Sequence, residues 1–184
     1  MKIYKVGGAI RDELLGINPK DTDWLVVGSS IDEMVDLGYK QVGKDFPVFL
    51  HPETNEEYAL ARKEIKSGQG HRDFKFIFSP DVTIEEDLSR RDLTINAIAK
   101  DDNGRLIDPF NGQTDLKNKV FKHVSDAFYE DPLRALRVAR FKAQMPEFQI
   151  HNSTKEALKT ISKTDELSCL SSERVWAEVV KSLN

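Results

Sequence analysis

The chain has 184 residues, of which 39% are hydrophobic and 32% charged, and its formal net charge at pH 7 is −4. This composition fits one globular domain, or one domain with a helical annex, and the acidic balance restricts any nucleic-acid contact to local basic patches. The sequence has no apolar run near the roughly 20 residues of a membrane span and no secretory signal. A single cysteine, Cys169, excludes an intrachain disulfide and indicates a reducing compartment, with the cytoplasm as the default.

The first third of the chain is predicted to alternate short strands with short helices. A strand over 3–6 precedes a helix over 9–15, which ends at Gly16. Residues 24–27 are continuously apolar, which predicts a central strand with both faces covered. Further expected elements are a helix over 31–37 capped by Ser30 and strand pieces at 39–42, 48–50 and 57–62.

The middle of the chain is rich in turn signals. The glycine-containing stretch 67–72 has no periodicity and is predicted to be a mobile loop, followed by a short helix over 83–88. The sequence DDNG at 101–104 predicts a hairpin turn, and DPFNG at 108–112 predicts a second turn before a helix from Gln113.

The last third is predicted to be helical, with helices over 131–142, 154–161 and 172–183 and no strand signal among them. We therefore divide the chain into a mixed sheet-and-helix unit over 1–125 and an all-helical unit over 126–184. The final helix carries an apolar stripe that favours a partner, although such stripes are more often core; its residues are Val175, Trp176, Val179, Val180 and Leu183.

One stretch combines a glycine turn with paired acids. Gly7 and Gly8 open the first helix, where free backbone N–H groups suit a phosphate. Asp21 and Asp23 are two residues apart, so they project from the same side of an extended strand. Because adjacent carboxylates repel, a divalent cation is their usual compensation. The pair predicts a site for Mg²⁺ and a nucleoside triphosphate; the alternative is a surface turn followed by an N-capping Asp-x-Asp.

Four further strings accompany this stretch: RRDLTINA at 90–97, DPFNG at 108–112, EDPLRALRVARF at 130–141 and SERVW at 172–176. In order and spacing, the five motifs resemble those of bacterial class II tRNA nucleotidyltransferases, the CCA-adding enzymes. Bacterial poly(A) polymerases share most of them. The resemblance implies an α+β fold, in which a polymerase β-like nucleotidyltransferase head with a small mixed sheet is followed by an all-helical neck.

The resemblance also implies roles for the residues in these motifs. Asp21 and Asp23 match the catalytic metal ligands of a two-metal reaction, and Glu57 matches a third catalytic carboxylate, with a solvated strand-end acid as the alternative. Gly8 and Arg11 would hold the triphosphate, and Arg91 and Asp92 match residues near phosphate and ribose. Asn96 is expected to brace this motif, and for Arg90 a simple surface charge is the alternative to a role in the site.

The helix expected to begin near Asp131 suggests how a base is selected. Asp131 only accepts hydrogen bonds and Arg134, three residues later, only donates them, so together they complement the edge shared by cytosine and adenine. Uracil and guanine present the reverse order. The alternative is a simple salt bridge between the two. Arg137 and Arg140 match positions that contact nucleotide, although Arg140 could instead pair with Glu130.

The resemblance implies CTP and ATP as substrates and the tRNA 3′ acceptor end as partner. Enzymes of this family continue past the position matching Asn184 into helical regions that grip the tRNA, so a missing C-terminal body and tail, or a protein partner, is expected. Three functions stay open: CCA addition, poly(A) polymerase activity, and a catalytically idle module that binds RNA or a partner.

Overall fold

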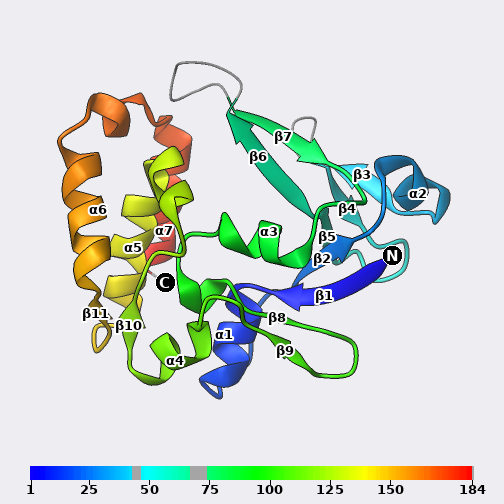
Figure 1. Cartoon of the computed structure of the whole chain (residues 1–184), viewed down its shortest axis with the longest axis horizontal. Coiled ribbons are helices and arrows are strands. Elements are labelled where there is room, and N and C mark those ends of the chain that lie inside the picture. The colour runs from blue at the N-terminus through cyan, green and yellow to red at the C-terminus, as the bar shows by residue number, and fades with distance from the viewer. Residues whose placement is uncertain (43–46, 67–73, 184) are drawn as a thin grey trace.

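A seven-stranded mixed sheet organises the computed structural model, which describes residues 1–42, 47–66 and 74–183 (Figure 1). The strand order is β3-β4-β5-β2-β1-β8-β9. The β2–β5 pair is parallel and the other pairs are antiparallel. The strands are β1 (Lys2–Val6), β2 (Asp23–Val27), β3 (Lys40–Val42), β4 (Val48–Leu50), β5 (Glu57–Leu60), β8 (Ala99–Lys100) and β9 (Leu106–Ile107).

Two-stranded sheets and short helices complete the structure. Figure 1 shows α5, α6 and α7 gathered at one end and the large sheet at the other. The small sheets pair β6 (Arg62–Lys66) with β7 (Phe74–Phe78), and β10 (Val120–Phe121) with β11 (Gln149–Ile150). The helices are α1 (Gly8–Leu14), α2 (Ile31–Asp36), α3 (Ile84–Ser89), α4 (Gly112–Lys117), α5 (Leu133–Gln144), α6 (Asn152–Ser162) and α7 (Ser172–Leu183), with 3-10 turns η1 (Thr94–Asn96), η2 (Asp126–Glu130) and η3 (Asp165–Cys169).

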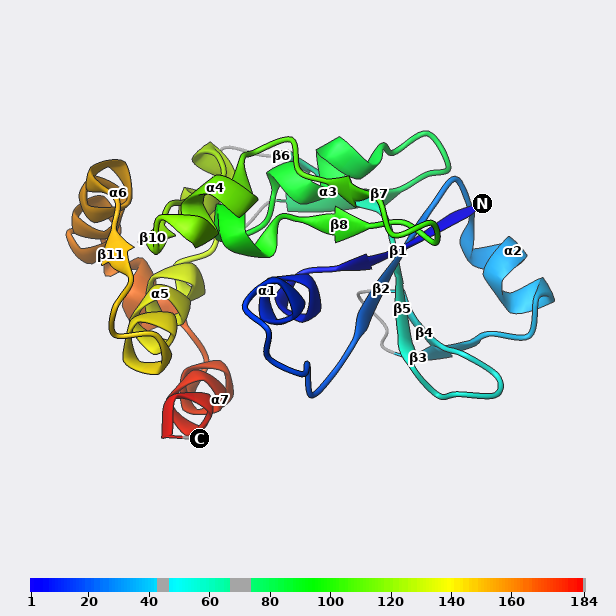
Figure 2. The ribbon, with the colours of Figure 1, turned by 90° about the horizontal axis from the view of Figure 1, so that it is seen from below.

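The β2 strand is central, as its apolar run predicts. Leu25 packs in a core cluster with Leu88 of α3, whereas Val26 packs in a second cluster with Met34 of α2 and Phe49 of β4. Because successive strand residues point to opposite faces, the two clusters cover both faces of the sheet. In Figure 2, α3 lies on one side of β1 and α1 on the other.

Local capping chemistry explains where several elements begin. Ser30 accepts a hydrogen bond from the Glu33 N–H at the start of α2, as predicted. Thr83 and Glu86 form a reciprocal capping box at the start of α3. The expected 101–104 turn joins β8 to β9, with Gly104 at φ 81°. The predicted loop at 67–72 lies outside the described residues.

The C-terminal third departs from the all-helical expectation in two places. Gln149 and Ile150 form β11, which pairs in parallel with β10, about 30 residues earlier. Two residues are too few to show a strand period, so this pairing left no sequence signal. The helix expected from Asp131 begins at Leu133 instead. Asp131 has φ −129° and ψ 106°, because the proline that follows it disfavours a helical backbone.

One hydrophobic cluster crosses the predicted boundary near residue 125. Leu93 and Phe121 pack with Phe128, Phe141 and Ile161. The division into units at 1–125 and 126–184 therefore stays a prediction, with a continuous core across it. The α7 stripe is exposed, with Trp176 at 65% and Leu183 at 80%. No helix among the described residues is long and apolar enough to cross a membrane.

Candidate active site

The Gly7–Gly8 turn lies where β1 ends and α1 begins. Gly7 has φ 75°, a conformation that favours glycine. A Cβ added there would lie 3.0 Å from Nη1 of Arg91 and 3.8 Å from Oδ2 of Asp23. At Gly8 it would lie 3.6 Å from Nη2 of Arg11. Two arginines and an aspartate thus surround the turn, and the contact with Arg91 at Gly7 is the tight one.

The three predicted catalytic carboxylates lie at one end of two neighbouring strands. Asp23 of β2 and Glu57 of β5 are register partners in the parallel pair, and Asp21 precedes β2. All three side chains are exposed. Within the described part of the chain, none of them forms a hydrogen bond or ion pair, and no three acids, histidines or cysteines cluster closely enough to hold a metal. Uncompensated Asp21 and Asp23 fit a cation as oxygen donors, but Glu57 does not complete a three-carboxylate set with them.

Arg11 joins α1 to η1. Its Nε donates to Asp12 Oδ1 at 2.8 Å, and its Nη1 donates to Asn96 Oδ1 at 2.9 Å. Asn96 in turn donates to Asp92 Oδ1 at 3.1 Å. Asn96 therefore braces its motif, as expected from the sequence. The predicted triphosphate ligand Arg11 stands at one end of this chain of hydrogen bonds.

Asp92, which precedes η1, and Arg137 of α5 form an ion pair in which the carboxylate is buried and the arginine half-buried. Asp92 is 5% exposed; its Oδ2 accepts from Arg137 Nε at 2.8 Å, and its Oδ1 also accepts from the Leu93 N–H. Burial disfavours both charged forms, but the pair outweighs it, so the pKa of Asp92 lies below its ordinary value and that of Arg137 above. Asp92 is thus an ionised carboxylate satisfied within the protein, and its predicted contact with ribose stays a prediction.

Glu178 of α7 is a site residue that the sequence reading missed. It is 5% exposed and accepts from Arg140 Nε at 2.6 Å, while Arg137 Nη1 lies 3.8 Å away. The Arg140 guanidinium also stacks 4.1 Å from the centre of the Phe141 ring. The ion pair of Arg140 is thus with α7, where Glu130 was the expected alternative. One signal existed: Glu178 directly precedes the stripe residues Val179 and Val180.

The structure does not assemble the predicted base-reading pair. Arg134 is 8% exposed, and its Nη1 donates to the Ala127 carbonyl at 2.6 Å. Asp131 lies before α5 instead of on it: Oδ1 accepts from the Leu133 N–H at 3.0 Å and Oδ2 from Arg174 Nη2 at 2.7 Å. The helical spacing that predicted a shared face fails because Pro132 keeps the residue before it, Asp131, out of the helical backbone conformation, so α5 begins only after the proline.

Arg90 and Arg91 both pair with Asp87 of α3. Arg91 Nη2 donates to Oδ2 at 3.3 Å, and Arg90 Nη2 donates to Oδ1 at 3.1 Å. The alternative that Arg90 is only a surface charge is wrong, because Asp87 is fully buried.

The DPFNG motif fixes how α4 packs against η1. Asp108 accepts hydrogen bonds from the Gly112 and Gln113 N–H groups at 2.6 and 2.9 Å, which caps α4. A Cβ on Gly112 would overlap the carbonyl of Thr94, so only glycine lets α4 pack this closely on η1. This motif is structural.

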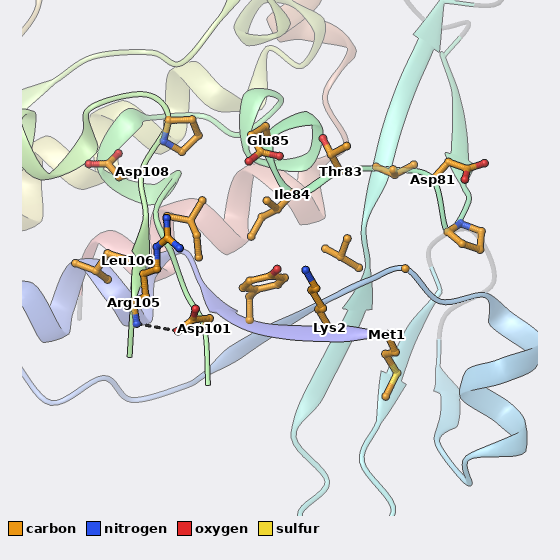
Figure 3. A pocket seen from close by; sticks show the side chains of 17 residues that line it. Met1, Lys2, Asp81, Thr83, Ile84, Glu85, Asp101, Arg105, Leu106 and Asp108 are labelled. Atoms are coloured by element: carbon orange, nitrogen blue, oxygen red, sulfur yellow. Dashed lines mark hydrogen bonds between the residues drawn. The ribbon is translucent and has the colours of Figure 1, made fainter. Parts of the chain in front are cut away.

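A cavity of about 810 Å³ lies at the opposite end of β1 from Gly7. Figure 3 shows Lys2 and Arg105 around it together with the acids Asp81, Glu85 and Asp101. It contains none of the predicted site residues, and its mixed charges indicate no single ligand class.

The comparisons with known proteins identify the family of this chain. The family model for the poly A polymerase head domain matches residues 3–122. The chain is 57% identical over 185 aligned residues to the multifunctional CCA protein of Vibrio vulnificus (strain YJ016), covering 100% of this chain and 46% of that protein. The chain thus spans less than half the length of this curated relative.

Solved structures show the same fold. The Bacillus stearothermophilus CCA-adding enzyme in complex with CTP aligns at 31% identity and a TM-score of 0.76, covering 98% of this chain and 44% of that one. The Thermotoga maritima CCA-adding enzyme complexed with tRNA aligns at 28% identity and a TM-score of 0.75, covering 100% of this chain and 43% of that one. The predicted resemblance and α+β head are confirmed, and the chain belongs to the poly A polymerase head domain family.

Proposed function

We propose that this chain is the head and neck of an enzyme that adds CCA to tRNA 3′ ends without a nucleic-acid template. The observation that carries the proposal is the continuous network from Arg11 through Asn96, Asp92 and Arg137 to Glu178. It connects three of the five sequence motifs to one another and to Glu178 of α7, two residues past the fifth motif. The tRNA and CTP complexes of the structural neighbours support the same substrates here.

In the proposed reaction, the RNA 3′-oxygen attacks the α-phosphorus of CTP or ATP, CMP or AMP is transferred, and pyrophosphate leaves. Asp21 and Asp23 would hold Mg²⁺, which in a two-metal arrangement supplies electrostatic stabilisation to the attacking and leaving oxygens. Gly8, Arg11 and Arg91 would hold the triphosphate by an N–H group and by charge. Glu57, in register with Asp23, is the candidate third catalytic carboxylate, placed beside the metal site and not among its ligands.

Base selection is assigned to Asp131 and Arg134, beside Arg137 and Arg140. Asp131 keeps free lone pairs after its two hydrogen bonds, so it can still accept from the amino group of cytosine or adenine. For Arg134 to donate to the ring nitrogen, its guanidinium must exchange the Ala127 carbonyl for the base. Direct reading by this pair therefore includes a local rearrangement.

The curated relative is longer than the region that aligns with this chain, which covers 46% of it. We expect the chain alone to bind CTP and ATP in a Mg²⁺-dependent way but tRNA weakly, because a C-terminal body or a partner would supply that grip. A reducing cytoplasm is the proposed location, consistent with the single exposed Cys169.

The second candidate is a poly(A) polymerase, favoured by the description of the matching family model. One experiment separates the two. tRNA transcripts ending before CCA, after C and after CC are offered labelled CTP or ATP, with and without Mg²⁺. CCA addition predicts C, C, then A and a stop, whereas a poly(A) polymerase adds A without limit and ignores CTP. Asp21→Ala tests the idle-module alternative, which requires every measured activity to survive that change.

A further inference from the structure

Asp87 is a fully buried carboxylate that the proposed reaction does not use. It lies in α3, and its carboxylate accepts from two neighbouring arginines and from a backbone N–H group of an earlier strand. Oδ1 accepts from the Arg62 backbone N–H at 3.3 Å and from Arg90 Nη2 at 3.1 Å, while Oδ2 accepts from Arg91 Nη2 at 3.3 Å. Burial by itself raises the pKa of the carboxyl, but Arg91 and Arg90 outweigh it, so the pKa lies below its ordinary value. The two arginines therefore favour the anionic form of Asp87.

The two arginines use this anion differently. Arg91 holds Oδ2 with one terminal nitrogen and extends the other, Nη1, to the Asn96 carbonyl at 3.5 Å. That second nitrogen is the atom nearest to a Cβ placed on Gly7, at 3.0 Å. The next two atoms around this position belong to Asp23 and Asn96. Arg91 thus spans from Asp87 to the glycine turn, whereas Arg90 meets the same carboxylate at its other oxygen.

The catalytic edge offers Arg91 a competing anion. Arg91 Nη1 and Asp23 Oδ2 both lie near the Gly7 Cβ position, so the two atoms are within about 7 Å of each other. Asp23 is exposed and unpaired within the described residues. An unanchored guanidinium would be drawn to that carboxylate, because opposite charges at this separation attract. Among the described residues, Arg91 instead makes its ion pair with Asp87, and no ion pair joins it to Asp23.

We propose that Asp87 is a positioning residue, which holds the Arg91 guanidinium against the Gly7 turn so that it can bind the triphosphate of any incoming nucleotide. The inference rests on the proposed function, since it deepens the role of Arg91 in the same site. Asp87 acts on phosphate and not on the base, so its effect is the same for every nucleotide.

The test measures the Kd of inorganic triphosphate and of CTP by calorimetry, with Mg²⁺, on the 184-residue chain. Asp87→Asn keeps an acceptor for the Arg62 N–H but removes the charge, and Arg91→Gln removes the proposed ligand. Each is expected to raise the Kd of both probes about tenfold, and the double variant no further than either single one. Arg90→Gln removes the other partner of Asp87 and serves as the matched control, with a change of less than about twofold.

The outcomes distinguish a failure of the positioning role of Asp87 from a failure of the proposed function. If the unaltered chain binds neither probe, or if Arg91→Gln binds both normally, the proposed function of the site fails. If Arg91→Gln weakens binding but Asp87→Asn does not, or if Arg90→Gln weakens it equally, only the positioning role is overturned. If the Asp87→Asn variant unfolds, the same two Kd values are measured on Arg91→Lys instead. Lysine keeps the charge but lacks the fork that spans both contacts, so normal binding by that variant contradicts the inference.

Discussion

Two regions of the molecule differ in how their charges are paired: the edge formed by the ends of β2 and β5 that carry the acids, and the ion-pair network between η1, α5 and α7. At the edge, Asp21, Asp23 and Glu57 are exposed and have no partner within the described residues. In the network, Asp92 and Glu178 are buried and each accepts from an arginine of α5. Like charges without partners lower stability and suit a cation from solution. A buried ion pair that loses one partner leaves the other charge buried and uncompensated, which costs much stability. The first region is arranged for binding and the second for holding its shape.

The largest expected effect is at the edge. Asp23→Asn should lower nucleotide transfer about 1,000-fold, because it removes a proposed metal ligand worth several kcal/mol at the transition state. Its free energy of unfolding should be unchanged or slightly higher, since a like-charge neighbour of Asp21 is removed. Transfer is measured with labelled CTP, and Asp36→Asn on α2 is the exposed control. A large loss of stability would break the comparison, because it would give Asp23 a structural role.

The network should show the reverse pattern. Glu178→Gln removes the partner of Arg140 and part of the charge facing Arg137, so we expect a loss of about 3 kcal/mol in the free energy of unfolding. Urea denaturation measures this loss, with the exposed Glu173→Gln on the same helix as control. A loss of stability no greater than that of the control would mean that Glu178 does not stabilise Arg137 and Arg140 of α5.

Base selection should change at Asp131 without a change of the chemical step. In Asp131→Asn, the side-chain amide can donate to the carbonyl of uracil, so the preference for CTP over UTP should fall about tenfold. Equilibrium binding of the four nucleotides measures it, with Asp165→Asn as the exposed control. If the preference stays intact, Asp131 does not read the base.

The smallest expected effect is at the most exposed of the ion pairs made by α7. The Arg174–Asp131 pair has side-chain exposures of 49% and 33%, in contrast to 11% and 6% for Arg140–Glu178. Arg174→Gln should therefore cost less than about 1 kcal/mol, and less still at high salt. Denaturation at two salt concentrations measures it. A cost near that of Glu178→Gln would show that burial does not separate the two contacts of α7.

Elements whose causes lie close together in sequence were predicted well. The Ser30 cap, the 101–104 turn and the apolar run of β2 each depend on neighbouring residues, and all three are present. The parallel pairing of β11 and the buried Arg134 depend on residues far along the chain and were not predicted. Asp87 could have been suspected from its i,i+4 spacing to Arg91, but spacing cannot tell a buried carboxylate from a solvated one.

The amino-acid sequence by itself determined the central strand, the glycine turn, the order of the five motifs and the family to which they belong. These follow from side-chain periodicity and turn chemistry, which act over a few residues. Only the tertiary structure decided which charges are paired: Arg137 with Asp92, Arg140 with Glu178, and Arg91 with Asp87. An arginine accepts any nearby carboxylate, so its partner is chosen by which helices pack together and by how deeply each pair is buried.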